Sequence, residues 1–129
     1  MRIYKLSLGI DYINDQDFQQ LKKKNLVSVH PNTKSKGQAH IRQGELYLQA
    51  NKGDLFYVCR SNNSIEFIGM FADNRPLYST IPNLSDWVDR EYVLLYAAKD
   101  PKAYDSSFDK WWSPKNNSTF IEIPLLIEQ

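Results

Sequence analysis

The sequence has few of the residue types on which metal centres and many enzyme sites depend. It contains one cysteine, Cys59, and two histidines, His30 and His40, which are ten positions apart. A lone cysteine cannot make an internal disulfide, and these residues lack the clustered spacing of metal ligands. Because Cys59 lies in an apolar run, we expect a small buried residue in a protein of the reducing cytoplasm. No metal site and no cofactor are predicted.

Long apolar runs and nucleotide-binding loops are also missing. No run approaches the length of a membrane span, and residues 1–12 lack the long apolar core of a signal peptide. There is no Gly-rich phosphate loop and no Gly-x-Ser-x-Gly elbow. Asp86, Asp89 and Glu91 crowd near Trp87, but a solvated loop face explains them better than acid–base catalysis. Nothing in these patterns argues for an enzyme, so we expect no catalytic residues.

A hairpin pattern stands in the middle of the chain. Two apolar, β-branched runs, Leu55–Cys59 and Ile65–Phe71, are separated by a polar segment that contains Asn62 and Asn63. Asn tolerates positive φ, so these two residues suit a hairpin turn. Nearly continuous apolar strands are typical of central strands that are covered on both faces.

The remaining elements are expected on both sides of this hairpin. A length of 129 residues fits one domain, 1–129, with one core. Asn14 is a good helix N-cap, with acids in the first turn and lysines in the last. The predicted strands are 2–8, 26–30, 92–96 and 119–123, the predicted helices are 14–25, 38–51 and a short one at 107–112, and 75–86 is a long loop. The predicted class is α+β, a small mixed barrel or curved sheet flanked by two or three helices.

Charge and aromatic residues point towards a ligand. The net charge is only +1, yet residues 20–60 carry eight Lys or Arg against two acids. Such a segment either faces phosphates or decorates a helix end, and both interpretations stay open. Aromatic residues fall in predicted loops, at Tyr78, Trp87 and Trp111-Trp112. Each either closes over the core or offers a flat face to a planar ligand, and a flipped base is such a ligand.

The order of the segments resembles the PUA-like superfamily, and within it the YTH and EVE domains that bind modified bases. The matching pieces are YKLS, VSVHPNTKSKGQAH, KGDLFYVCRSNNSIEFIGMF, LSDWVDREYVLLY, FDKWWSP and FIEIPLLIE. They span nearly the whole chain, and their order rather than any single motif carries the resemblance. EVE-like modules also stand at the N-termini of McrB-type modification-dependent restriction enzymes.

The resemblance implies a PUA-like fold and a base pocket. It places a histidine, His30, where YTH domains usually have a second cage tryptophan, so the identity of the modified base stays open. The implied function is recognition of a modified base in DNA by flipping, with modified RNA as the nearest alternative. A PUA-like protein-interaction or small-molecule module is the alternative from another class. An attached or partner nuclease or GTPase and a cytoplasmic location are also implied. The expected base-binding residues are Ser7, Asp11, His30, Asn32, Thr33, Tyr78 and Trp87, and the expected phosphate contacts are Lys34, Lys36 and Arg42.

Overall fold

The computed structural model describes residues 1–34, 41–60, 64–99 and 119–123. This part of the chain contains seven strands, two α-helices and one short 3-10 helix. In chain order they are β1 (Ile3–Ser7), α1 (Asp15–Lys23), β2 (Leu26–Val29), α2 (Gln43–Gln49), β3 (Leu55–Cys59), β4 (Ile65–Phe71), β5 (Leu77–Tyr78), η1 (Pro82–Leu84), β6 (Val88–Ala97) and β7 (Phe120–Glu122). The α+β class that the sequence predicts is confirmed.

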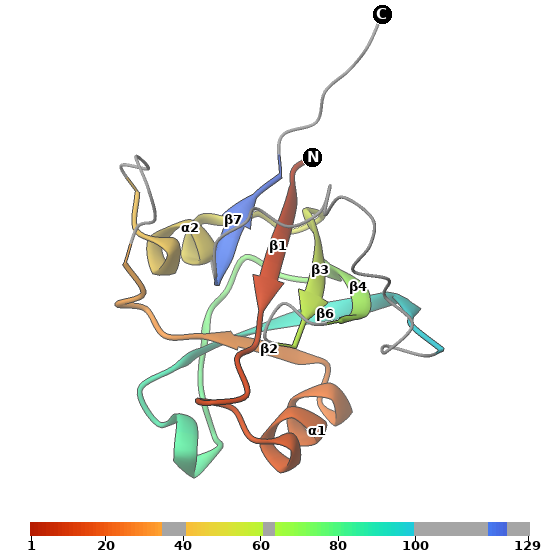
Figure 1. Cartoon of the computed structure of the whole chain (residues 1–129). Helices are drawn as coiled ribbons and strands as arrows, with labels where there is room; N and C mark the ends of the chain where they lie inside the picture. The colour runs from red at the N-terminus through yellow and green to blue at the C-terminus, as the bar shows by residue number, and fades with distance from the viewer. Residues whose placement is uncertain (35–40, 61–63, 100–118, 124–129) are drawn as a thin grey trace, which may run out of the picture.

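The strands form one mixed sheet that curls into a half-barrel (Figure 1). The strand order is β2-β6-β4-β3-β1-β7, and β5 pairs with the first residues of β6. Only β1 and β3 are parallel among these pairs. Helix α1 and η1 lie at one end of the curled sheet, whereas α2 lies beside β7 (Figure 1). The hairpin of β3 and β4 is central in this order, as predicted.

Helix α1 forms where its end signals predict it. The side chain of Asn14 accepts a hydrogen bond from the amide of Asp17 at 2.8 Å, which satisfies a donor that the first turn leaves open. Ile13 before this cap and Phe18 after it are both buried, as a hydrophobic staple requires. The helix ends at Lys23, and Asn25, just after the C-cap Lys24, has a φ of 55°, the left-handed conformation that stops a helix.

The core is rich in aromatic rings. Tyr4 and Phe120 stack with centroids 4.6 Å apart, and Phe67 and Tyr92 stack at 5.0 Å. Aromatic pairs in such geometries contribute about 0.5–1.5 kcal/mol beyond their buried area. Both faces of β3 are buried, as predicted for a central strand, but Ile68 in β4 is 37% exposed, so one face of β4 is only partly covered.

A buried arginine joins the second helix to the sheet. Arg90 in β6 is fully buried, and its guanidinium donates to the carbonyl oxygens of Tyr47, Ala50 and Asp73 at 2.8–2.9 Å. The same group lies 4.5 Å from the centroid of the Phe71 ring. These contacts fix the C-terminal end of α2 against β6 and the residues that follow β4. Burial lowers the pKa of Arg90 because it penalises the charged form.

Several predicted boundaries differ from the structure. The second helix is shorter than 38–51, since it begins at Gln43. The predicted loop 75–86 contains β5 and η1. Strand β6 begins at Val88, four residues before the predicted start, because pairing with β2 and β5 overrides the low strand propensity of Asp89 and Arg90. The predicted turn at 62–63, the short helix at 107–112 and both tryptophans at 111–112 lie outside the described residues. In the described ranges, no helix is long and apolar enough to span a membrane.

Candidate aromatic binding site

The start of β6 brings His30 and Trp87 together. In the antiparallel register Val29 lies opposite Val88, so His30, just after β2, faces Trp87, just before β6. Their ring centroids are 5.9 Å apart, with the ring planes at 87°. This is an edge-to-face contact, so the two rings form a corner and not a parallel sandwich. Both residues are partly buried, and Trp87 packs against the core.

The turn after His30 holds its ring and backbone in place. The Nδ1 atom of His30 accepts from the amide of Asn32 at 3.1 Å, and the hydroxyl of Thr33 donates to the carbonyl oxygen of His30 at 2.7 Å. A ring nitrogen that accepts carries no proton, so the proton of the neutral ring lies on Nε2. Asn32 and Thr33 therefore serve the turn itself in this structure.

The first turn of α2 packs against this same turn. The amide of Gly44 donates to the carbonyl oxygen of Thr33 at 3.1 Å. A Cβ atom at Gly44 would lie 2.5 Å from the carbonyl carbon of Pro31 and closer still to its oxygen. Only glycine permits this approach, because real Cβ atoms essentially never come so near to backbone atoms. The helix thus fixes the position of the turn that carries His30.

Gln43 connects this turn to β7 and β1. Its amide nitrogen donates to the carbonyl oxygen of Lys34 at 2.8 Å, and its amide oxygen accepts from the backbone N–H groups of Thr119 and Phe120. The carbonyl oxygen of Thr119 in turn accepts from the amide of Ser7 at 2.7 Å. Ser7, a predicted base-binding residue, is therefore linked to the His30 turn through Thr119 and Gln43. Ser7 itself is only 9% exposed.

The other predicted residues are more dispersed. Tyr78 is 88% exposed and lies opposite Val88, next to the row that contains Trp87. Asp11 is exposed in the loop between β1 and α1. Lys34 and Arg42 are exposed on either side of the undescribed residues 35–40, which include Lys36.

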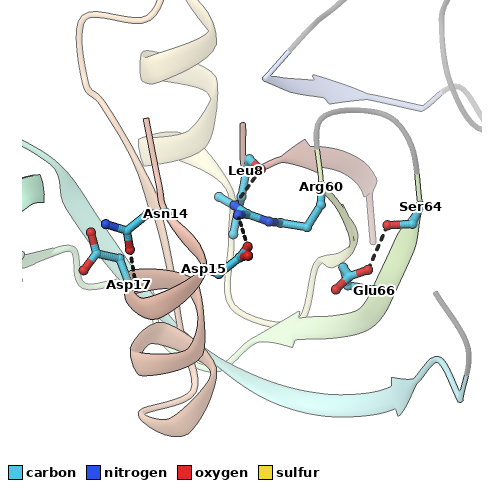
Figure 2. A network of polar contacts seen from close by, with 7 residues as sticks. All are labelled: Leu8, Asn14, Asp15, Asp17, Arg60, Ser64 and Glu66. Atoms are coloured by element: carbon cyan, nitrogen blue, oxygen red, sulfur yellow. Dashed lines mark hydrogen bonds and ion pairs between the residues drawn. The ribbon is translucent and has the colours of Figure 1, made fainter. Parts of the chain in front are cut away.

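One cation of the basic segment has a structural role. Arg60 is 8% exposed, and its guanidinium donates to the carbonyl oxygen of Leu8 at 3.1 Å and to Asp15 at 2.9 Å (Figure 2). Its guanidinium also lies 4.6 Å from the centroid of the Phe18 ring. The donors of Arg60 therefore hold the end of β3 against α1, so this cation of the segment 20–60 is used within the protein. Lys24 also contacts the protein, through the hydroxyl of Thr80 at 3.3 Å.

Two buried polar residues were missed by sequence reasoning. Ser28 and Asp89 lie directly opposite each other in β2 and β6 and are 0% and 2% exposed. The Oδ1 atom of Asp89 has no hydrogen-bond partner among the described residues. Burial raises the pKa of Asp89, while the Ser28 hydroxyl and the charge of Lys24 act in the opposite direction. The only sequence signal was the polar Ser28 inside the predicted strand 26–30, because Asp89 precedes the predicted strand 92–96 and nothing in the sequence pairs residues 28 and 89.

Metal ligands and the single cysteine can be checked against the structure. No group of three or more His, Cys, Asp or Glu side chains in the described ranges could hold a metal ion. Cys59 is fully buried, as predicted, and burial raises its pKa to about 12. Because the thiolate is the nucleophile, such a cysteine is inert near neutral pH.

Comparisons with known proteins add little. No family model and no curated protein matches the chain. Among solved structures, the NMR structure of a structural genomics target from Rhodopseudomonas palustris matches with 12% identity and a TM-score of 0.42. The match covers 78% of this chain and 66% of that one, so the chain spans just under two thirds of that protein's length. Neither the 12% identity nor the TM-score of 0.42 is high enough to carry an argument about fold or function.

Proposed function

We propose that this chain is a nucleic-acid-binding module that recognises a modified base in DNA, flipped out and stacked at the corner of His30 and Trp87. The observation that supports the proposal is this pair of rings, brought together at the ends of two paired strands. One base on an aromatic face contributes about 1–3 kcal/mol, and any base has such a face. In this view the PUA-like, EVE-like or YTH-like resemblance of the sequence reflects shared function.

The perpendicular rings define how a base would sit. A planar ligand cannot lie between rings that already touch edge to face at 5.9 Å. It stacks on the indole of Trp87 and meets the edge of His30, or the rings turn towards parallel around it. The His30 ring presents Nε2–H as a donor, since Nδ1 is occupied by Asn32.

Phosphate contacts are assigned to exposed cations near the His30 turn. Lys34 directly follows this turn and Arg42 precedes α2, and both are exposed. Lys36, between them, is proposed for the same role from the sequence alone. Cations that displace counterions from phosphates make affinity fall with salt. A cytoplasmic protein that serves a modification-dependent restriction system, with an attached or partner nuclease or GTPase, fits this function.

Binding to a panel of oligonucleotides that differ in one base modification tests the proposal. Trp87→Ala should weaken binding to the preferred oligonucleotide by about 1–3 kcal/mol without loss of the folded state. Tyr96→Ala is the matched control, because Tyr96 is an aromatic residue with 59% exposure in the far half of β6. If no modified oligonucleotide binds more tightly than unmodified DNA, the modified-base function is rejected. Binding to modified RNA alone would favour the alternative function, recognition of a modified base in RNA.

Substitution of His30 tests the second ring. His30→Ala should lower affinity, because it removes one wall of the corner. His30→Trp should strengthen stacking yet reduce discrimination between modified bases, since an indole cannot accept from the Asn32 amide and its N–H donor does not take the position of the His30 Nε2–H. If both variants keep the affinity and preference of the parent, His30 does not face the ligand. Salt-independent binding would favour a neutral small molecule as the ligand instead.

A further inference from the structure

The buried pair Ser28 and Asp89 lies next to the aromatic corner in the register of β2 and β6. His30 and Trp87 stand one residue beyond the ends of these strands, and continuing the strand alternation by that residue assigns Asp89 to the face of Trp87, and Ser28 to that of His30. Two residues of strand span roughly 7 Å, about the width of one base. The register that sets Val29 opposite Val88 therefore places the polar pair one row behind the ring pair.

The free oxygen of Asp89 has no structural explanation among the described residues. Only 2% of this residue is exposed, and its Oδ1 atom has no hydrogen-bond partner there. Leaving a buried acceptor unpaired costs about 1–3 kcal/mol, and more if the group is charged. Such atoms are rare in native structures and call for an explanation, for example in a ligand.

We propose that Asp89 determines specificity at this site, with its Oδ1 atom accepting a hydrogen bond from the amino group of the stacked base. The inference rests on the proposed function and adds the chemical class of the base. It selects cytosine-type or adenine-type bases that keep at least one N–H on the exocyclic amino group. Bases with a carbonyl oxygen at that position present an acceptor to an acceptor and are disfavoured. A site whose buried acceptor needs an N–H donor rejects a base that lacks this donor, because the acceptor would then stay unpaired.

Asp89 is only 2% exposed, so a base can reach it only if neighbouring side chains move. The proposal assigns this movement to the rings of His30 and Trp87. A base that inserts between the rings turns them towards parallel and brings its amino edge to Asp89. Stacking and edge recognition are then coupled in one movement, and binding should change the near-UV circular dichroism of the aromatic residues.

The test compares oligonucleotides that differ only in the amino group. One pair carries 5-methylcytosine or thymine at the central position, and the other carries adenine or hypoxanthine. The parent should bind the amino-bearing member of at least one pair 10-fold or more tightly. Asp89→Asn should reduce that ratio to threefold or less, because an amide can turn its NH2 group towards a carbonyl oxygen. Glu91→Gln is the matched control, being the same kind of charge change at an exposed residue of the same strand.

The outcomes separate this inference from the proposed function. If the parent binds no oligonucleotide, both are rejected. If Trp87→Ala abolishes binding but folded Asp89→Asn keeps the parent ratio, only the inference about Asp89 is overturned. Should Asp89→Asn fail to fold, Ser28→Ala takes its place, because it removes the hydroxyl that lies opposite Asp89 and favours the charged form of its carboxyl group. Ser28→Ala is expected to lower the ratio of affinities for the amino-bearing and carbonyl-bearing oligonucleotides at least threefold. An unchanged ratio would equally overturn the inference.

Discussion

Substituting Gly44 by alanine sets two opposite effects against each other. In an isolated helix the change would stabilise by about 1 kcal/mol, because alanine has the higher helix propensity. Here the new Cβ would lie 2.5 Å from the carbonyl carbon of Pro31 and closer to its oxygen. Both atoms belong to the backbone, so the turn or the helix must move. Overpacking of this kind costs about 1–3 kcal/mol.

The hydrogen bond at the same place adds to the loss. A shift that relieves the clash weakens the bond from the Gly44 amide to Thr33, which is 3.1 Å long and contributes about 0.5–1.5 kcal/mol. After the propensity gain is subtracted, the net destabilisation is about 1–3 kcal/mol. At about 2.1 cal/mol/K per residue, a chain of 129 residues loses roughly 4 °C per kcal/mol. The expected fall in Tm is therefore about 4–12 °C.

Calorimetry and ligand titration measure the two consequences of Gly44→Ala. The turn that carries His30 should move with Pro31, so affinity for the preferred oligonucleotide should fall together with Tm. Gly9→Ala is the control, because its Cβ would meet only the Tyr12 ring, at 3.8 Å. Its Tm should stay within a few degrees of the parent. A rise in Tm for Gly44→Ala would show that helix propensity dominates and that α2 does not fix the turn.

Four further results are expected. Arg90→Met should lower the free energy of unfolding by about 3 kcal/mol or more in a urea titration, since it removes three hydrogen bonds of the guanidinium, two of them buried; an effect below 1 kcal/mol contradicts this. Charge reversal at Lys34 or Arg42 should lower the slope of log affinity against log salt by at least one each; unchanged slopes would remove these residues from the phosphate contacts. Cys59, with a pKa raised to about 12, should resist a thiol reagent at pH 8 until the protein unfolds, and rapid native labelling would refute its burial. Asp89 has a raised pKa, so its contribution to stability is full below the unfolded-state pKa and decreases as pH rises through the folded-state pKa; Asp89→Asn should remove that part of the pH dependence of unfolding.

Local signals in the sequence were enough to predict α1 and the central hairpin. The cap at Asn14 and the apolar runs of β3 and β4 are each encoded within a few residues. The long β6 was predicted only in part, because its first residues include Asp89 and Arg90, which disfavour strands. Their partners are residues of β2 and β5, and such long-range pairing is not visible in a local pattern.

The residues of the candidate site likewise fall into those that the sequence predicted and those that it did not. His30 and Trp87 were chosen because the chain resembles a known arrangement, and the structure brings their rings into contact. The sequence contains no local sign of the close approach of Gly44 to Pro31, since a glycine in a predicted helix usually indicates only a weaker helix. Asp89 was interpreted as a solvated acid, because nothing in its neighbours shows that Ser28 lies opposite. Residues whose environment comes from distant segments were the ones that sequence reasoning missed.

The amide of Gln43 makes the far end of the described chain part of the site. It holds Lys34 with one atom and the start of β7 with the other. A chain shortened before Thr119 would leave the Gln43 oxygen without its two donors and free the side chain to turn away from Lys34. A fragment for binding experiments should therefore retain residues 119–123, even though they are remote in sequence from both aromatic rings. A shorter fragment would also lose the buried Phe120, which stacks on Tyr4, so its loss of binding would not show that residues 119–123 contact the base.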